Sequence, residues 1–147
     1  VQGIPHRGAE IMKEGLESGA IEPSELAYST YSDTLLQSRE WELALEPLTK
    51  AAELKEDGTL FVRVAQVNLQ LGRWGDARKA LARAFEKGGL PDEGQAHILS
   101  GIAAANAKQW NAANSSFDRA ARFDGTAEVA GKWKDYVRRE RARLGES

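Results

Sequence analysis

Three tryptophans recur at nearly equal intervals and constrain the fold more than any other feature of the chain. Trp41, Trp74 and Trp110 lie 33 and 36 residues apart. Each opens the same pattern, in which Ala, then Leu or Phe, then Ala follow the tryptophan at offsets of 3, 7 and 10 residues. With 3.6 residues per turn, these offsets place all four side chains on one face of a helix. The repeat therefore predicts a tandem array of similar helical units.

A second helical stretch of similar length precedes each tryptophan. Its apolar stripe contains a small residue at the same place in every copy, which allows a neighbouring helix to approach closely; these residues are Ser32, Ala65 and Gly101. The joints Gly72-Arg73 and Lys108-Gln109 are too short for anything other than an antiparallel pair of helices. The three stretches cover residues 25–37, 58–71 and 94–107.

The composition agrees with a helical chain and excludes several classes of function. Ala accounts for 23 of 147 residues and Leu for 15, against 11 for Val and Ile together, which favours helices over strands. The absence of cysteine excludes disulfides and thiolate zinc sites. The 20 basic and 22 acidic residues argue against a general nucleic-acid binder. No apolar run is long enough to span a membrane, and the start at Val1 without Met predicts a mature or excised segment.

None of the residues that could carry chemistry stands in a catalytic or metal-binding pattern. We expect His97 to be a packed structural side chain and His6 to be a surface residue, because neither has a partner at ligand or acid-base spacing. Gly88-Gly89 is interpreted as a helix C-cap. The basic stretch 138–143 could contact an acidic partner, although basic residues also stabilise the end of a helix. No catalytic residue, metal or cofactor is expected.

The alternation of paired helices every 34 residues or so resembles the tetratricopeptide repeat (TPR). The resemblance implies an all-α, right-handed superhelix of antiparallel hairpins with a leading helix and a C-terminal capping helix. We expect Pro47 to bend its helix without breaking it and Trp133 to dock the capping helix. Asn68 makes the second repeat imperfect. A single domain over 1–147 is expected, with the leading helix at 5–19, repeats at 24–57, 58–90 and 91–124, and the capping helix at 126–144.

Such a stack leaves a concave groove lined mainly by the first helix of each hairpin. In this chain the groove positions combine aliphatic side chains with uncharged amides, which suits an extended or helical peptide. They lack the Lys, Asn and Arg set by which some TPR proteins grip a C-terminal carboxylate, and RNA-reading repeats would need a basic channel. The expected partner-binding residues are Ser29, Asp33, Gln37, Val62, Gln66, Leu69, Gln70, Ile98, Ile102 and Asn106.

A second similarity rests on the order and spacing of several segments, which are residues 15–22, 46–54, 57–63, 87–90, Trp133 and 136–137. In these segments the sequence is similar to the C-terminal part of periplasmic TPR proteins that are encoded beside TonB–ExbB–ExbD systems. The similarity implies a Gram-negative periplasm, further repeats upstream, and a scaffolding role in TonB-dependent uptake, with TonB, ExbB or ExbD components as possible partners. It supplies no catalytic residues.

The main functional hypothesis is therefore a non-enzymatic scaffold that binds a protein or peptide in the groove. Two alternatives from other classes stay open. One is an oligomerisation or structural module without a groove ligand, built around Trp133 on the terminal helix. The other is an enzyme or ligand-binding domain whose site is completed by a segment upstream of Val1. The oligomeric state does not follow from the sequence.

Overall fold

The computed structural model describes residues 4–146, with side chains from residue 7 onward, and this part of the chain is entirely helical without strands. The eight helices follow one another through short connections. They are α1 (Ile4–Ser18), α2 (Glu25–Gln37), α3 (Trp41–Leu54), α4 (Thr59–Gln70), α5 (Trp74–Lys87), α6 (Glu93–Asn106), α7 (Trp110–Ala120) and α8 (Ala127–Arg143). The first helices of the three hairpins begin and end within one residue of the stretches expected at 25–37, 58–71 and 94–107, and α3, α5 and α7 each begin at a tryptophan.

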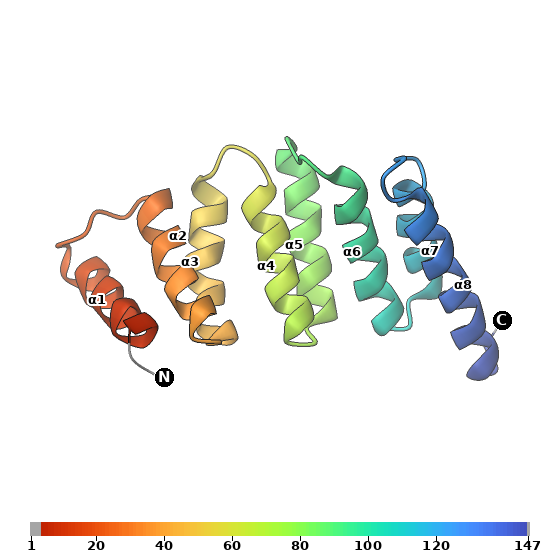
Figure 1. The fold of residues 1–147 in the computed structure, drawn as a ribbon, viewed down its shortest axis with the longest axis horizontal. Coiled ribbons are helices and arrows are strands. Elements are labelled where there is room, and N and C mark those ends of the chain that lie inside the picture. Colours follow the sequence, from red (N-terminus) through yellow and green to blue (C-terminus); the bar gives the residue numbers. More distant parts are fainter. Residues whose placement is uncertain (1–3, 147) are drawn as a thin grey trace.

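The helices form three hairpins in a row, α2 with α3, α4 with α5 and α6 with α7, flanked by α1 and α8 (Figure 1). Each helix packs mainly against its neighbours in sequence, and α6 also contacts α4 and α8. The two ends of the chain lie at opposite ends of the row (Figure 1). This arrangement of antiparallel hairpins is a TPR-like solenoid and confirms the expected fold class.

The three hairpin turns have the same local geometry, which the residue two positions before each tryptophan determines. There the backbone takes a positive φ, at Gly72 (φ 73°) and also at two residues that carry a side chain, Arg39 (φ 59°) and Lys108 (φ 60°). The following residue closes each turn with a backbone hydrogen bond back to the first helix; for example, Gln109 N donates to Ala104 O at 2.9 Å. The left-handed residue thus ends one helix and aims the chain into the next.

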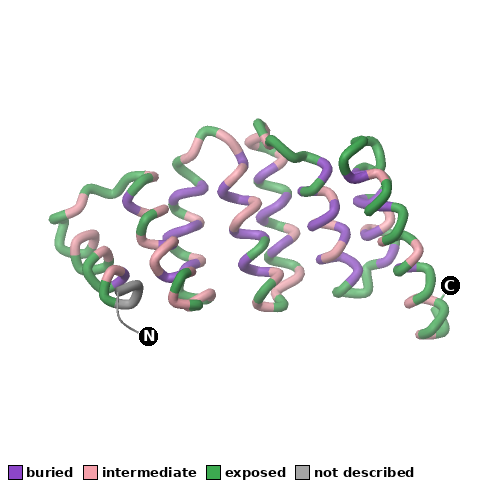
Figure 2. The backbone as a smooth tube through the Cα atoms, in the orientation of Figure 1, coloured by how far each residue is buried: buried purple, intermediate pink, exposed green. Residues whose placement is uncertain are grey.

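The stripe that follows each tryptophan forms the core. The Ala, Leu or Phe, and Ala side chains of all three copies are fully buried, including Leu48, Leu81 and Phe117. Figure 2 shows that buried segments alternate with exposed ones along the helices of the array. The small residues of the first helices also lie inside: Ser32 and Ala65 are fully buried, and Gly101 contacts Phe117 so closely that a Cβ would stand 2.3 Å from its Cε1 atom.

Several single-residue expectations are confirmed. Pro47 lies buried inside α3, which continues through it to Leu54 without a break, while the expected bend at Pro47 stays a prediction. Gly88 caps α5 with a positive φ. The Trp133 ring stacks on Phe117 with 5.8 Å between centroids and so docks α8 onto α7. Asn68 is buried where an apolar residue was expected, and its amide donates to Val64 O at 3.1 Å.

Candidate interaction surface

The expected groove residues lie on the first helices of the three hairpins. We call the exposed surface of α2, α4 and α6 the A face, and the exposed surface of α3, α5 and α7 the B face. The ten residues divide among the A-face helices as follows: Ser29, Asp33 and Gln37 on α2; Val62, Gln66, Leu69 and Gln70 on α4; Ile98, Ile102 and Asn106 on α6.

The A face is hollowed between α2 and α4. In the described part of the chain, no Cα atom of α2 lies within 8 Å of a Cα atom of α4, whereas α4 and α6 approach each other more closely. A hollow of about 270 Å³ lies between α2 and α4, and Trp41 is one of its lining residues. Leu36, Trp41 and Val67 provide apolar surface, and Arg63, Gln66 and Gln70 provide polar groups. The structure thus brings two of the expected residues, Gln66 and Gln70, together at one cavity.

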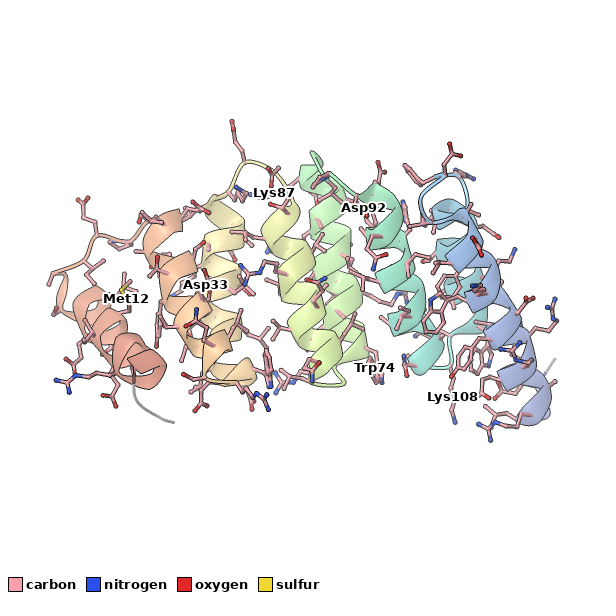
Figure 3. All side chains as sticks on the ribbon, viewed as in Figure 1. Met12, Asp33, Trp74, Lys87, Asp92 and Lys108 are labelled. Atoms are coloured by element: carbon pink, nitrogen blue, oxygen red, sulfur yellow. The ribbon has the colours of Figure 1, made fainter. Side chains whose placement is uncertain are left out.

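Asp33 and Arg63 join α2 to α4 beside this hollow. The guanidinium Nη2 of Arg63 donates to Asp33 Oδ1 at 3.0 Å, and the two side chains are 42% and 47% exposed. Figure 3 labels Asp33 on the array. The expected groove residue Asp33 therefore already has a partner within the chain, and a ligand would meet an ion pair at this point, not a free carboxylate.

Arg63 was missing from the residues expected in the groove. The sequence carried one signal for it, since Arg63 follows Asp33 by 30 residues, close to one repeat length. Residues one repeat apart on adjacent first helices become neighbours in the stack, so opposite charges at that spacing indicate an ion pair between repeats.

The other expected residues differ in what they offer to a partner. Gln37 is exposed, whereas Val62, Leu69 and Ile102 are half-buried because they also pack against the core. The Ser29 hydroxyl lies 3.4 Å from Glu25 Oε1, and the exposed Asn106 amide donates to Ile102 O at 2.9 Å. These side chains extend the A face on both sides of the hollow.

Ile98 corrects the sequence-based expectation. Its side chain is only 2% exposed and belongs to the core cluster that contains Val137 of α8 and Phe117 of α7. The capping helix covers the end of α6, so Ile98 is part of the core and is not available to a partner. The same cluster buries Ala105, which lies at another position of the groove pattern.

No group of three or more His, Asp or Glu side chains that could hold a metal ion occurs among the described residues. The His97 ring stacks on Phe85, with 4.3 Å between centroids, and its side chain is 12% exposed, as expected for a structural residue. Burial lowers the pKa of His97, and the nearby Glu93 partly opposes this effect. The side chain of His6 lies outside the described residues.

The basic stretch at the end of α8 is engaged locally. Arg138 forms an ion pair with Asp135, and the Arg143 guanidinium donates to both carboxylate oxygens of Glu140 at 2.9 Å. The hydrogen bonds from Arg143 lower the pKa of Glu140.

Within residues 4–146, no helix combines the length and apolar character that crossing a membrane requires.

Solved structures with the same architecture are TPR proteins. The chain is similar to the TPR domain of Arabidopsis OM64 (17% identity, TM-score 0.63, 93% of this chain and 99% of that one). It is also similar to YrrB, described as a TPR protein with an unusual peptide-binding site (20% identity, TM-score 0.73, 94% and 70%). A third neighbour is MamA from Desulfovibrio magneticus (16% identity, TM-score 0.65, 99% and 90%).

No protein-family model matches the chain, and no curated protein is similar enough in sequence to count as a relative. The identities to the solved structures are low, so these structures establish the fold and not the partner. The comparisons together with the helix arrangement show that the chain has the TPR fold.

Proposed function

We propose that the chain is a non-enzymatic scaffold that binds an extended peptide segment of a partner protein on the A face. The observation that carries the proposal is the hollow between α2 and α4, where Leu36, Trp41 and Val67 meet the amides of Gln66 and Gln70. Peptide grooves combine apolar area, which supplies affinity, with groups that pair with the peptide backbone.

The side-chain amides of Gln66 and Gln70 are suited to hydrogen bonding with the uncharged backbone of a bound peptide. Each primary amide offers two N–H donors and a carbonyl acceptor, so it can pair with both the C=O and the N–H of an extended peptide. Gln66 and Gln70 are both exposed and lie one turn apart on α4, at the same cavity. The description of YrrB as a peptide-binding TPR protein supports the same reading by analogy of fold.

Selection of binding peptides from a random library on the immobilised chain tests the proposal. Calorimetry would then compare the wild type with Gln66→Arg/Gln70→Arg, which fills and charges the hollow. We expect affinity to fall by about tenfold or more, since one lost hydrogen bond to a buried group is worth roughly 1 kcal/mol and the bulk of two arginines adds to it.

Asn111→Arg provides the matched control, because Asn111 is an exposed amide on α7, away from the A face. It should bind the selected peptide as the wild type does. Equal affinity of the wild type and Gln66→Arg/Gln70→Arg, with both chains fully helical by circular dichroism, would remove the A face as the binding site.

A finer part of the proposal places this scaffold in the periplasm as an accessory of a TonB-dependent transport system. Its support is the sequence similarity to TPR proteins encoded beside TonB–ExbB–ExbD systems. Cross-linking in the cell of origin, followed by mass spectrometry, tests it. Capture of TonB, ExbB or ExbD is the expected result, and reproducible capture of other proteins only would contradict it.

A further inference from the structure

A second hollow opens on the opposite surface, the B face, between α5 and α7. It measures about 410 Å³, within the range of roughly 300–1,000 Å³ that is typical of ligand pockets. Helix α6 contributes its floor, where the His97 ring stacks on Phe85. The polar side chains of the lining are Arg78, His97, Ser100, Ser115, Ser116 and Arg119.

The lining of this hollow contains two guanidinium groups and no carboxylate. The chain as a whole has a formal net charge of −2. The corresponding hollow between α1 and α3 is lined by two lysines and two glutamates, so its charges cancel. The hollow between α5 and α7 therefore attracts anions, whereas the charges around the hollow between α1 and α3 cancel.

The repeat explains how this imbalance arises. Nine residues after each tryptophan stands a cation: Lys50, Arg83 and Arg119. Lys50 pairs with Glu46 at 3.1 Å, and Arg83 pairs with Glu53 at 3.7 Å. Arg119 forms no such ion pair in the described part of the chain, and the residue that corresponds to Glu46 in this repeat is Ser115. One helical turn before Arg119, the third repeat thus has the hydroxyl of Ser115 where the first repeat has a carboxylate.

Arg78 of α5 lines the same hollow, and its guanidinium group has a hydrogen-bond donor that is not used within the described part of the chain. Its Nη1 donates to Gln109 Oε1 at 2.6 Å, while its Nε is buried and has no hydrogen-bond partner among the described residues. On α6 and α7, the hydroxyls of Ser100 and Ser116 lie 3.4 Å apart, a distance at which their mutual hydrogen bond is weak. The hollow thus combines two cationic donors with hydroxyls that are poorly used within the chain.

We infer that the hollow between α5 and α7 binds the phosphate group of a phosphate monoester, with Arg119 and Arg78 as charged donors and the serine hydroxyls as neutral ones. Guanidinium groups match the oxygens of phosphate with two donors at a time, and charge-assisted hydrogen bonds of this kind are the strong ones. The volume leaves room beside the phosphate for its carrier, against Phe85 and Ala82. The carrier can be a free small molecule or a phosphoserine side chain, which share this chemistry.

The two histidines of the chain provide a readout that is independent of any partner. In the chain alone, burial and the nearby Arg119 and Arg122 lower the pKa of His97, while Glu93 raises it. A phosphate bound beside His97 stabilises the imidazolium form and so raises the pKa of His97. His6 lies in the first turn of α1, at the other end of the array, and serves as the internal reference. NMR of the imidazole resonances follows both groups in one sample.

The experiment titrates the full chain with inorganic phosphate, with a short phosphoserine peptide and with its serine counterpart, at constant ionic strength. We expect a saturable upward shift of the His97 pKa with at least one of the two phosphate probes, and none with the serine peptide. Tighter binding of the phosphopeptide would identify a phosphorylated side chain as the carrier of the phosphate group, and tighter binding of inorganic phosphate would identify a free small molecule.

Arg119→Gln should weaken this binding by about tenfold or more, since a hydrogen bond to a charged group contributes roughly 1.5–3 kcal/mol. Lys79→Gln removes the same charge from an exposed position outside the hollow and should leave the affinity unchanged. Shifts of equal size at His6 and His97, no saturation, or unaltered binding by Arg119→Gln would each overturn the inference.

Discussion

The ring of Phe117 on α7 occupies the space in which a side chain on Gly101 of α6 would begin. A Cβ at Gly101 would lie between 2.3 and 2.6 Å from three atoms of that ring, and Phe117 itself is fully buried. The close approach of the two helices in the third hairpin therefore depends on the missing side chain, which is the physical reason for the small residue at this place in the repeat.

Gly101→Ala should destabilise the chain by about 1–3 kcal/mol, because the buried ring cannot move aside without disturbing the core. Urea denaturation measures the change. Gly131→Ala on α8 is the matched control, since nothing lies within 4 Å of a Cβ there. That substitution should raise stability by roughly 0.5–1 kcal/mol through helix propensity alone. Similar losses for both variants would show that the contact with Phe117 is not the cause.

Lys108→Gly should stabilise the chain by about 0.5–1 kcal/mol, because Lys108 holds a left-handed backbone conformation that favours glycine. The equivalent position in the second hairpin already carries Gly72. Thermal unfolding of Lys108→Gly and of Gly72→Ala should therefore give shifts of opposite sign. If Lys108→Gly lowers the melting temperature, the turn does not impose the strain that its geometry indicates.

Asp33 and Arg63 should contribute a small, salt-sensitive coupling between the first two hairpins. Both side chains are more than a third exposed, so a double-mutant cycle with Asp33→Asn and Arg63→Gln is expected to give about 0.2–1 kcal/mol. The coupling should decrease in 1 M salt, where the Debye length falls to about 3 Å. A coupling that is unaffected by salt would argue against an ion pair.

Removal of the Trp133 ring should loosen the end of the array without unfolding the rest. Trp133 stacks on Phe117 and meets Tyr136 edge-on at 5.5 Å between centroids. In a solenoid, a terminal helix is held only by its neighbours. Relative to the wild type, Trp133→Ala should accelerate hydrogen exchange more in α8 than in α4 and α5. Lys132→Ala, at an exposed position, should leave the exchange rates unchanged. The same samples test the oligomerisation alternative, because a monomer in sedimentation for both wild type and Trp133→Ala would exclude it.

Acidification should destabilise the third hairpin through His97. Burial lowers the pKa of His97 below its ordinary value of 6.5, so in the window below that value the unfolded chain binds more protons than the folded one. His97 therefore makes its full contribution to the free energy of unfolding above pH 6.5, and this contribution is lost as the pH falls toward the lowered pKa of His97. Urea denaturation at pH 7.5 and 5.5 should show a smaller loss for His97→Phe, which keeps a ring against Phe85, than for the wild type or His6→Gln. An equal loss in all three would assign the effect to other groups.

The sequence predicted what depends on one helix or one hairpin. The tryptophan period gave the starts of α3, α5 and α7, and the small residues gave the close crossings at Ala65 and Gly101. What it did not predict depends on how successive repeats sit against each other. Ile98 follows the groove pattern, yet the cluster shared with α8 buries it. Arg63 and the hollow beside Arg119 involve residues from two hairpins, and the pattern of a single helix holds no information about them.

The central claim is that the A face, at the hollow between α2 and α4, binds peptides. Chemical-shift mapping of the isotope-labelled chain with a selected peptide tests this claim most directly. The side-chain amides of Gln66 and Gln70 and the indole N–H of Trp41 should show the largest changes, with saturation at one peptide per chain. Changes confined to the B face, or to α1 and α8, would contradict it.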